Sequence, residues 1–319
     1  MARIALKIDA DTWRGTRLGV PALAELLQRE EAGATFLFSL GPDHTGWAIT
    51  RALRPGFLSK VSRTSVVEHY GVRTLLYGTV LPGPDIGRRE GAGMRAVRDA
   101  GFEVGVHAWD HVRWHDRVAA ESAAWTGAEM RRASVRFAEI FGDAPRVHGA
   151  AGWQMNEAAY RLEAELGFAF ASDTRGSCPY LPVDGGGTVL GPPQLPTTLP
   201  TLDELIGLDG CTPGNAHERL LGLTGETGPD QVFTLHAELE GMKLLPVFER
   251  LLRGWRAQHH TLISLGRMFA ELDCTALPRC RAMAGAVPGR SGSLAVQGHE
   301  VAKAQATGLD AATDTRRNR

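Results

Sequence analysis

Residues 3–11 read Arg-Ile-Ala-Leu-Lys-Ile-Asp-Ala-Asp, an apolar run that ends in two carboxylates. The run from Arg3 to Ile8 predicts a strand. The segment from Val20 to Glu31 follows with apolar residues at helical spacing and with Pro21 in a first-turn position. Ala34 to Leu40 is again apolar and rich in β-forming residues, which predicts a second strand. This strand–helix–strand order is typical of a parallel sheet with crossover helices.

The same alternation continues along the chain and predicts an α/β fold. Further strands are expected at Glu103–His107, Val147–Ala151, Phe168–Ser172, Val232–His236 and Thr261–Ser264, and further helices at Gly91–Ala100, Thr126–Phe141, Asn156–Leu166, Pro246–Gln258 and Leu265–Leu272. Thr126 and Glu129 have the spacing of a capping box at the start of one helix. Strands that are apolar throughout, such as residues 35–38, fit a sheet covered on both faces.

Polar side chains gather where these strands end. Asp9 and Asp11 end the first strand, and His107 follows the apolar run at residues 104–106. Asp173 and His236 end two later strands. Because folds of this type place their active sites at the C-terminal ends of the strands, we expect these side chains to form one site.

His107 and His111 are four residues apart, so their imidazoles can converge on one ion if the segment makes a helical turn. Such a pair alone is more often found on a surface or at a helix cap. A strand-end carboxylate beside it favours a catalytic metal site with open positions. One of Asp9 and Asp11 could then bind the metal while the other accepts a proton from water. The alternative is a helix N-cap or an acid pair in a loop.

His236 is the natural general acid for an amide hydrolysis, in which the departing amine must be protonated. Glu238 shares its side if the strand continues, so it could orient His236 or contact substrate. The alternative for a single histidine at a strand end is a polar residue whose hydrogen bonds are satisfied within the fold.

Three of these segments, residues 9–11, 107–111 and 235–236, resemble the first, second and last motifs of the polysaccharide deacetylases, carbohydrate esterase family four. The resemblance implies an irregular (β/α)7 barrel that removes N-acyl groups from amino sugars. It also implies that Asp9 is the general base and His236 the general acid, with Asp11, His107 and His111 as ligands. The implied cofactor is a divalent metal, foremost zinc, with cobalt, manganese or iron open.

A larger set of motifs resembles one branch of that family, whose members remove a formyl group from a formamido sugar on a polyprenyl phosphate, for lipid A modification and resistance to cationic peptides. The set comprises Ile8–Arg17, Gly41–Asp43, His107–His111, Ala150–Trp153, Ser172–Gly176, Leu199–Thr201 and His236–Glu238. The expected substrate is therefore a polyprenyl phosphate-linked sugar. Two alternatives stay open, an N-deacetylase of another amino sugar and a catalytically silent sugar- or lipid-binding barrel.

One segment departs from the wider family. Its third motif usually supplies an arginine that holds the general base, whereas Ala151-Gly152-Trp153 occupies that region here. We expect Arg175 to position Asp9 instead, with Asp173 nearby, although residues 173–176 could equally form a plain turn.

Two basic features suit the expected lipid phosphate. Arg14 and Arg17 flank Gly15-Thr16 at the start of the first helix. Guanidinium groups and a helix N-terminus favour the binding of a phosphate. The alternative is that both arginines are only solvated. The insertion His44–Pro84 combines basic and aromatic residues, which predicts contact with an anionic membrane surface or, alternatively, an amphipathic cover over the barrel.

Composition limits the remaining possibilities. A formal net charge of −1 gives no case for nucleic-acid binding. The N-terminus lacks the pattern of a signal peptide and no run approaches the ~20 apolar residues of a membrane-spanning helix, so we expect a cytoplasmic protein peripheral to the inner face of the inner membrane. A catalytic domain is predicted over residues 1–275, and residues 285–319, rich in Ala, Gly, Ser and Thr, are predicted to be a disordered tail.

Overall fold

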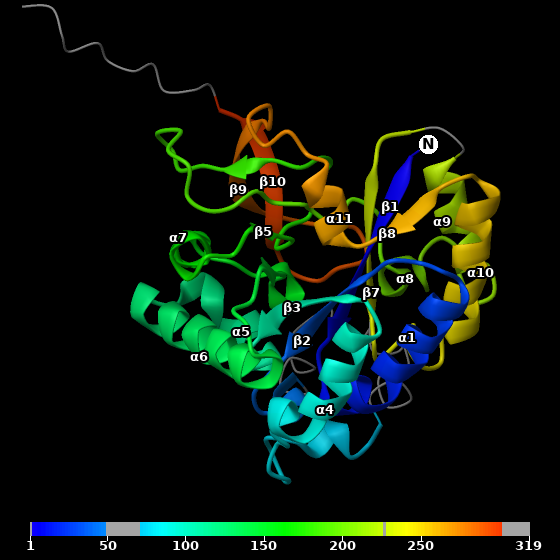
Figure 1. Cartoon of the computed structure of the whole chain (residues 1–319), viewed down its shortest axis with the longest axis horizontal. Helices are drawn as coiled ribbons and strands as arrows, with labels where there is room; N and C mark the ends of the chain where they lie inside the picture. The colour runs from blue at the N-terminus through cyan, green and yellow to red at the C-terminus, as the bar shows by residue number, and fades with distance from the viewer. Residues whose placement is uncertain (1, 49–70, 226–227, 302–319) are drawn as a thin grey trace, which may run out of the picture.

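The computed structural model describes residues 2–48, 71–225 and 228–301, and the statements below concern this part of the chain. A parallel sheet of seven strands forms its body, and the helices lie outside the strands (Figure 1). The strands are β1 Arg3–Ala10, β2 Thr35–Ser39, β3 Glu103–Ala108, β4 Val147–His148, β5 Phe170–Ala171, β7 Gln231–His236 and β8 Thr261–Ile263. All seven were predicted, and the α/β class with parallel strands is confirmed.

Strand β1 is the strand around which the sheet is organised, because partners occupy both of its edges. The order is β5-β4-β3-β2-β1-β7, with β8 also on β1. Strand β7 pairs along Ile4–Asp9, whereas β2 pairs with Lys7–Ala10 and β8 with Arg3–Ala5. Strands β2 and β8 therefore share the edge opposite β7. The β1–β7 register sets Asp9 directly beside His236.

Side chains of β1 alternate between two apolar cores. Ile4, Leu6 and Ile8 belong to the larger core, which also contains apolar residues of the surrounding helices, while Ala5 belongs to a smaller one. The period-two alternation of a strand puts Lys7 and Asp9 on the same face as Ala5. The charged side chains of Lys7 and Asp9 thus enter the interior from a strand that is apolar between Arg3 and Lys7.

The described ranges contain nine helices, and six of them were predicted, with two differences at their starts. The nine are α1 Val20–Arg29, α4 Ile86–Asp99, α5 His111–Arg117, α6 Ala123–Phe141, α7 Glu157–Leu166, α8 Leu202–Leu205, α9 Ala216–Thr224, α10 Leu245–Ala257 and α11 Leu265–Ala270. Helices α5, α8 and α9 were not predicted. Helix α4 begins five residues before the expected Gly91, because Asp85 caps it by accepting a hydrogen bond from the Arg88 amide. The predicted capping box is wrong: the N-cap of α6 is Ser122, and Thr126 lies inside the first turn.

Residues 285–301 form ordered structure, so the predicted disordered tail is wrong for this part. Strand β9 (Arg279–Gly285) pairs antiparallel with β10 (Leu294–Glu300), and β6 (Leu181–Pro182) completes a small separate sheet (Figure 1). The Gln297 amide also donates to the Arg175 carbonyl at 2.7 Å. This strand is held by backbone hydrogen bonds to distant segments, which a weak hydrophobic pattern does not reveal. Residues 302–319 lie outside the described part.

The predicted insertion is described only in part. Residues 49–70 lie outside the described ranges, and the remainder includes a short 3₁₀ turn at Thr74–Leu76. Leu75, Leu76 and Tyr77 are half-buried or buried against the rest of the chain. The limits of the catalytic domain remain a prediction.

Candidate metal centre and active site

Three side chains converge at the ends of β1 and β3, between which β2 lies in the sheet. Asp11 follows β1, His107 lies in β3, and His111 is the first residue of α5, whose N-cap is Asp110. His107 Nε2 lies 3.2 Å from Asp11 Oδ1, and His111 Nε2 lies 3.4 Å from Asp11 Oδ2. One ligand atom from each residue lies within 4.8 Å of the others. The structure thus brings the three predicted ligands together at the C-terminal edge of the sheet.

The donor atoms of this cluster suit a divalent cation. His107 Nδ1 lies 2.6 Å from the Gly149 carbonyl oxygen, which can only accept, so Nδ1 carries the proton. In the neutral ring, Nε2 then presents a lone pair to Asp11 Oδ1, a buried atom with no hydrogen-bond donor among the described residues. Burial raises the pKa of Asp11, but the imidazoles of His111 and His107 lower it more, leaving it well below its usual range. A carboxylate and an imidazole facing each other without a shared proton call for a cation between them.

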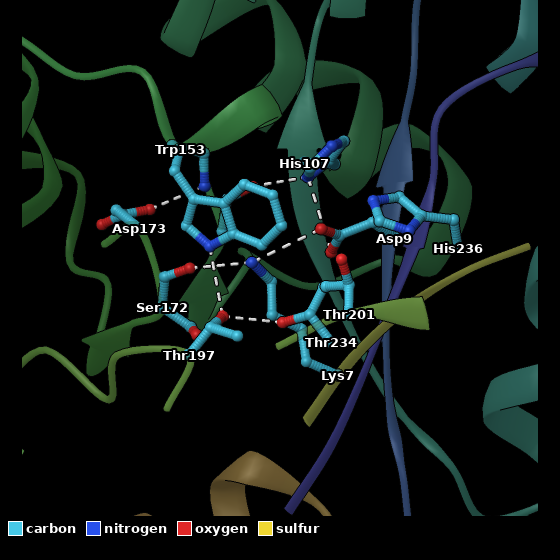
Figure 2. Close-up of polar contacts among 12 residues, drawn as sticks. Lys7, Asp9, His107, Trp153, Ser172, Asp173, Thr197, Thr201, Thr234 and His236 are labelled. Carbon is cyan, nitrogen blue, oxygen red and sulfur yellow. Dashed lines mark hydrogen bonds and ion pairs between the residues drawn. The ribbon is translucent and has the colours of Figure 1, made fainter. Parts of the chain in front are cut away.

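Asp9 lies beside this cluster and is 3% exposed. Its Oδ2 is 3.4 Å from Lys7 Nζ, and its Oδ1 is 3.8 Å from His107 Nδ1 (Figure 2). The expectation that Arg175 positions Asp9 is wrong. Arg175 instead pairs with Glu204 and donates to backbone carbonyls at residues 197 and 199. The cation in contact with Asp9 is Lys7, which precedes it by two residues on β1.

His236 lies at the end of β7, next to Asp9 on the paired strand β1. Its Nδ1 is buried and has no hydrogen-bond partner in the described ranges, and its ring meets Trp153 edge-to-face at 6.3 Å. Its backbone amide donates to Glu240 Oε2 at 2.8 Å. Burial raises the pKa of Glu240 to about 7, although His236 opposes the shift. His236 therefore has one buried ring nitrogen without a hydrogen-bond partner in the described ranges, beside Asp9 at the C-terminal edge of the sheet.

The sequence allowed Glu238 to orient His236, but Glu238 makes its hydrogen bonds elsewhere. Its Oε1 accepts hydrogen bonds from the amides of Asp11 (3.1 Å) and Thr12 (2.8 Å) and from the Thr12 hydroxyl (2.8 Å). A Cβ at Gly15 would lie 1.9 Å from the same oxygen, so only glycine allows this close approach. Glu238 therefore ties the Asp11 turn to the end of β7.

Asp173 belongs to a second, wholly buried cluster that the sequence did not reveal. His148 Nδ1 lies 2.8 Å from both Asp173 Oδ1 and Glu163 Oε1. Asp173 Oδ1 also accepts from the Ala150 amide at 2.8 Å. This cluster thus holds the backbone on either side of Gly149, whose carbonyl fixes the tautomer of His107.

The Trp153 ring is in contact with three cationic side chains. Its ring centroid lies 5.2 Å from Lys7 Nζ, 5.1 Å from the Arg175 guanidinium and 4.8 Å from that of Arg290. Its Nε1 donates to Thr197 Oγ1 at 3.1 Å. The segment that replaces the family's arginine motif therefore supplies an aromatic wall, 2% exposed, rather than a charge.

A basic group lies at the start of the first helical segment, close to the site. The Arg17 and Arg89 guanidinium groups lie 5.2 Å and 5.7 Å from the centroid of the Trp13 ring. Arg14 donates to Met242 Sδ at 3.6 Å. Arg89, on α4, was missed because nothing in the sequence links residues 13 and 89.

Two curated relatives are similar to this chain over most of its length. A protein of Shewanella sediminis, named as a probable 4-deoxy-4-formamido-L-arabinose-phosphoundecaprenol deformylase ArnD, is 37% identical over 79% of this chain and 81% of its own. The chain belongs to this deformylase family. A second member, from Wigglesworthia glossinidia brevipalpis and bearing the same name, is 32% identical over 89% of this chain and 98% of its own. No protein-family profile matches the chain.

Solved structures agree on the fold of this family member. A Mycobacterium smegmatis protein described as a polysaccharide deacetylase superposes with a TM-score of 0.62 at 17% identity, over 90% of this chain and 94% of its own. Puue allantoinase superposes with a TM-score of 0.56 at 14% identity, over 84% and 88%. The predicted irregular (β/α)7 barrel of the polysaccharide deacetylase type is confirmed.

Proposed function

We propose that this hydrolase cleaves the formamide C–N bond of 4-deoxy-4-formamido-L-arabinose carried on undecaprenyl phosphate, which yields formate and the 4-amino sugar. The observation that carries the proposal is the Asp11, His107 and His111 cluster, beside which Asp9 and His236 lie next to each other at the ends of β1 and β7. Deformylases of this name are the relatives that match most of the chain. The amino sugar then serves lipid A modification, which lowers negative surface charge and gives resistance to polymyxin and other cationic peptides.

The residues divide the reaction between them. Asp11, His107 and His111 would hold a divalent metal, which supplies a Lewis acid for the formyl oxygen and lowers the pKa of water. Zinc is the proposed ion, since a His₂Asp set leaves positions open, and cobalt, manganese or iron fit the same donors. Asp9 accepts the proton of the attacking water through Oδ1, which has no hydrogen-bond donor among the described residues. His236 protonates the departing sugar nitrogen.

The basic group beside the site suits the phosphodiester of the substrate. Arg17 and Arg89 are both exposed, and each lies over the Trp13 ring rather than in an ion pair with a described carboxylate. Guanidinium groups bind phosphate oxygens through two parallel hydrogen bonds. Arg14 lies on the same turn. We place the phosphate of the lipid carrier at this group.

Arg17→Ala and Arg89→Ala test this placement, with Arg88→Ala as the matched control because Arg88 lies on the same helix but pairs with Asp85. The two test variants should raise KM for the lipid-linked substrate about 10-fold, the loss of roughly one charge-assisted hydrogen bond. Hydrolysis of a phosphate-free formamido sugar should not change. An equal effect on both substrates would place the phosphate elsewhere.

The same side of the molecule is suited to an anionic bilayer. No helix in the described ranges is long and apolar enough to span a membrane. Leu18, Val72 and Val80 are exposed by 49%, 64% and 76%. A Cβ at Gly71 would lie 3.5 Å from Arg14, so the turn that bears Val72 adjoins the basic group. We propose that the surface formed by Leu18, Val72, Val80 and the basic group docks on the inner face of the inner membrane.

Formate release tests the proposed reaction directly. Formate from the lipid-linked formamido sugar supports it, whereas acetate from an N-acetyl glycan would identify a deacetylase and no product from either would identify a binding protein. Sedimentation with anionic vesicles tests the docking, and equal sedimentation without vesicles would exclude it.

A further inference from the structure

Lys7 is a fully buried lysine in the middle of an apolar strand, with 0% of its surface exposed. An ammonium group removed from water costs several kcal/mol unless it is paired and hydrogen-bonded. Hydrophobic burial alone would favour an apolar residue at this position. The lysine therefore calls for an explanation in the chemistry of the site.

Three contacts surround its ammonium group. Nζ donates to the Ser172 carbonyl at 2.9 Å, lies 3.4 Å from Asp9 Oδ2 and lies 5.2 Å from the Trp153 ring centroid (Figure 2). A Cβ at Gly149 would lie 3.0 Å from Lys7 Cε and 3.3 Å from Nζ, so the absence of a side chain there leaves room for the lysine. The ammonium group is thus fixed from several sides.

The strand itself sets the pair. Lys7 and Asp9 are two residues apart in β1 and therefore point to the same face. Both edges of β1 are paired at these residues, with β7 and with β2, so the backbone that bears the pair is rigid. The relation between the two side chains is fixed by a single strand rather than by two separate loops.

We infer that Lys7 is the positioning residue of the general base, and this rests on the role proposed for Asp9. The Lys7 ammonium, anchored on Ser172 and Trp153, engages Asp9 Oδ2 and fixes the carboxylate plane. Oδ1 is left without a hydrogen bond among the described residues and faces His107. Oδ1 is therefore the atom that receives the water proton. Lys7 performs from β1 the task that was expected of Arg175.

Lys7→Met tests the assignment, because methionine has similar length and suits the apolar strand. The variant should keep its metal content and its cooperative unfolding and should lose turnover about 100-fold, the cost of a misplaced reacting group. KM should not change. Lys7→Arg should recover part of the loss. Arg290→Met is the matched control, since Arg290 contacts the same Trp153 ring but not Asp9, and its turnover should stay close to that of the wild type.

A double variant separates positioning from a merely structural role. If Lys7 acts through Asp9, Lys7→Met should have no further effect on residual turnover in an Asp9→Asn protein. An equal loss in both backgrounds, or loss of metal from Lys7→Met, would overturn the inference. The kinetics use whichever N-acyl sugar the wild-type protein hydrolyses, so acetate release instead of formate would overturn the proposed substrate and leave this comparison intact. If neither product forms, a crystal structure of Lys7→Met decides, because an Asp9 carboxylate in its wild-type orientation would contradict the inference.

Discussion

The described part of this barrel contains two groups in which histidine and carboxylate side chains lie close to one another. Only one of the two groups has the donor arrangement of a metal centre. Asp11, His107 and His111 form the first, and His148, Glu163 and Asp173 form the second; in each, the candidate ligand atoms lie within 4.8 Å of one another. Their residue types are nearly the same. The difference between them is the position of the protons.

In the first group, Nδ1–H of His107 donates a hydrogen bond to the Gly149 carbonyl, and Nε2 of the neutral ring faces the Asp11 carboxylate with a lone pair. In the second, His148 Nδ1 lies 2.8 Å from two carboxylates at once. Burial lowers the pKa of His148, but Asp173 and Glu163 together raise it to about 10. Burial and Asp173 raise the pKa of Glu163 well above its usual value.

The second group is therefore an imidazolium, an ionised Asp173 and a protonated Glu163, with no net charge. Asp173 Oδ2 has no other donor in the described ranges, and a protonated Glu163 can donate a hydrogen bond to Asp173, so the group can be satisfied without a metal. Its structural task is to hold the backbone around Gly149, which in turn orients His107. Residue composition alone does not separate a metal centre from a closed ion network, whereas the hydrogen-bond partner of one ring nitrogen does.

The largest effects should come from the ligands. His107→Ala and His111→Ala should lose bound metal and essentially all turnover, because each removes one of three donors. Elemental analysis after desalting, with a formate assay, measures both. His148→Gln is the matched control, since it removes a buried histidine outside the first group, and it should keep one metal per chain. Metal loss in His148→Gln alone would reverse the comparison.

Next in size are the acid and the base. Asp9→Ala and His236→Ala should keep metal but lower turnover by about 10²- to 10⁴-fold, the usual contribution of a positioned acid or base. Full activity in either protein would remove that residue from the mechanism.

The second group should respond in stability. Asp173→Asn should lower the free energy of unfolding by about 3–5 kcal/mol, because it removes the carboxylate that is ionised beside a buried imidazolium. Glu163→Gln should cost far less, since a neutral amide replaces a carboxyl group that is already neutral. Urea unfolding of metal-free protein compares the two, and equal losses would mean that Glu163 is ionised.

The stability contributed by this group should also depend on pH. Since the folded-state pKa of His148 lies near 10, above its ordinary value of 6.5, its contribution to stability is complete below pH 6.5. It is then lost as pH rises toward 10, at no more than about 1.4 kcal/mol per pH unit. The difference in unfolding free energy between metal-free wild type and His148→Gln should show this slope. A difference independent of pH would indicate a neutral His148.

Much of this site could be predicted from the sequence because it lies on regular strands. The ends of β1, β3 and β7 follow from apolar runs, and Asp9, His107 and His236 stand at those ends. Lys7 could also have been found, since a lysine two residues before Asp9 must share its face. Arg175 was expected instead, because the third motif of the wider family supplies an arginine.

Other features depend on pairings that no local pattern encodes. Glu163 reaches His148 from the buried face of α7, and strand β10 is fixed by hydrogen bonds to β9 and Arg175. The weak pattern of residues 285–301 therefore predicted disorder wrongly. The contact between Arg89 and Trp13 likewise depends on how α4 packs.

The central claim is that one metal centre, formed by Asp11, His107 and His111, drives release of formate. Metal titration of chelator-stripped protein, with formate release from the lipid-linked substrate measured at each addition, tests it most directly. Activity and bound metal should rise together and saturate at about one ion per chain, as a single three-ligand site requires. Formate release by the stripped protein, or saturation only at two ions, would contradict the account.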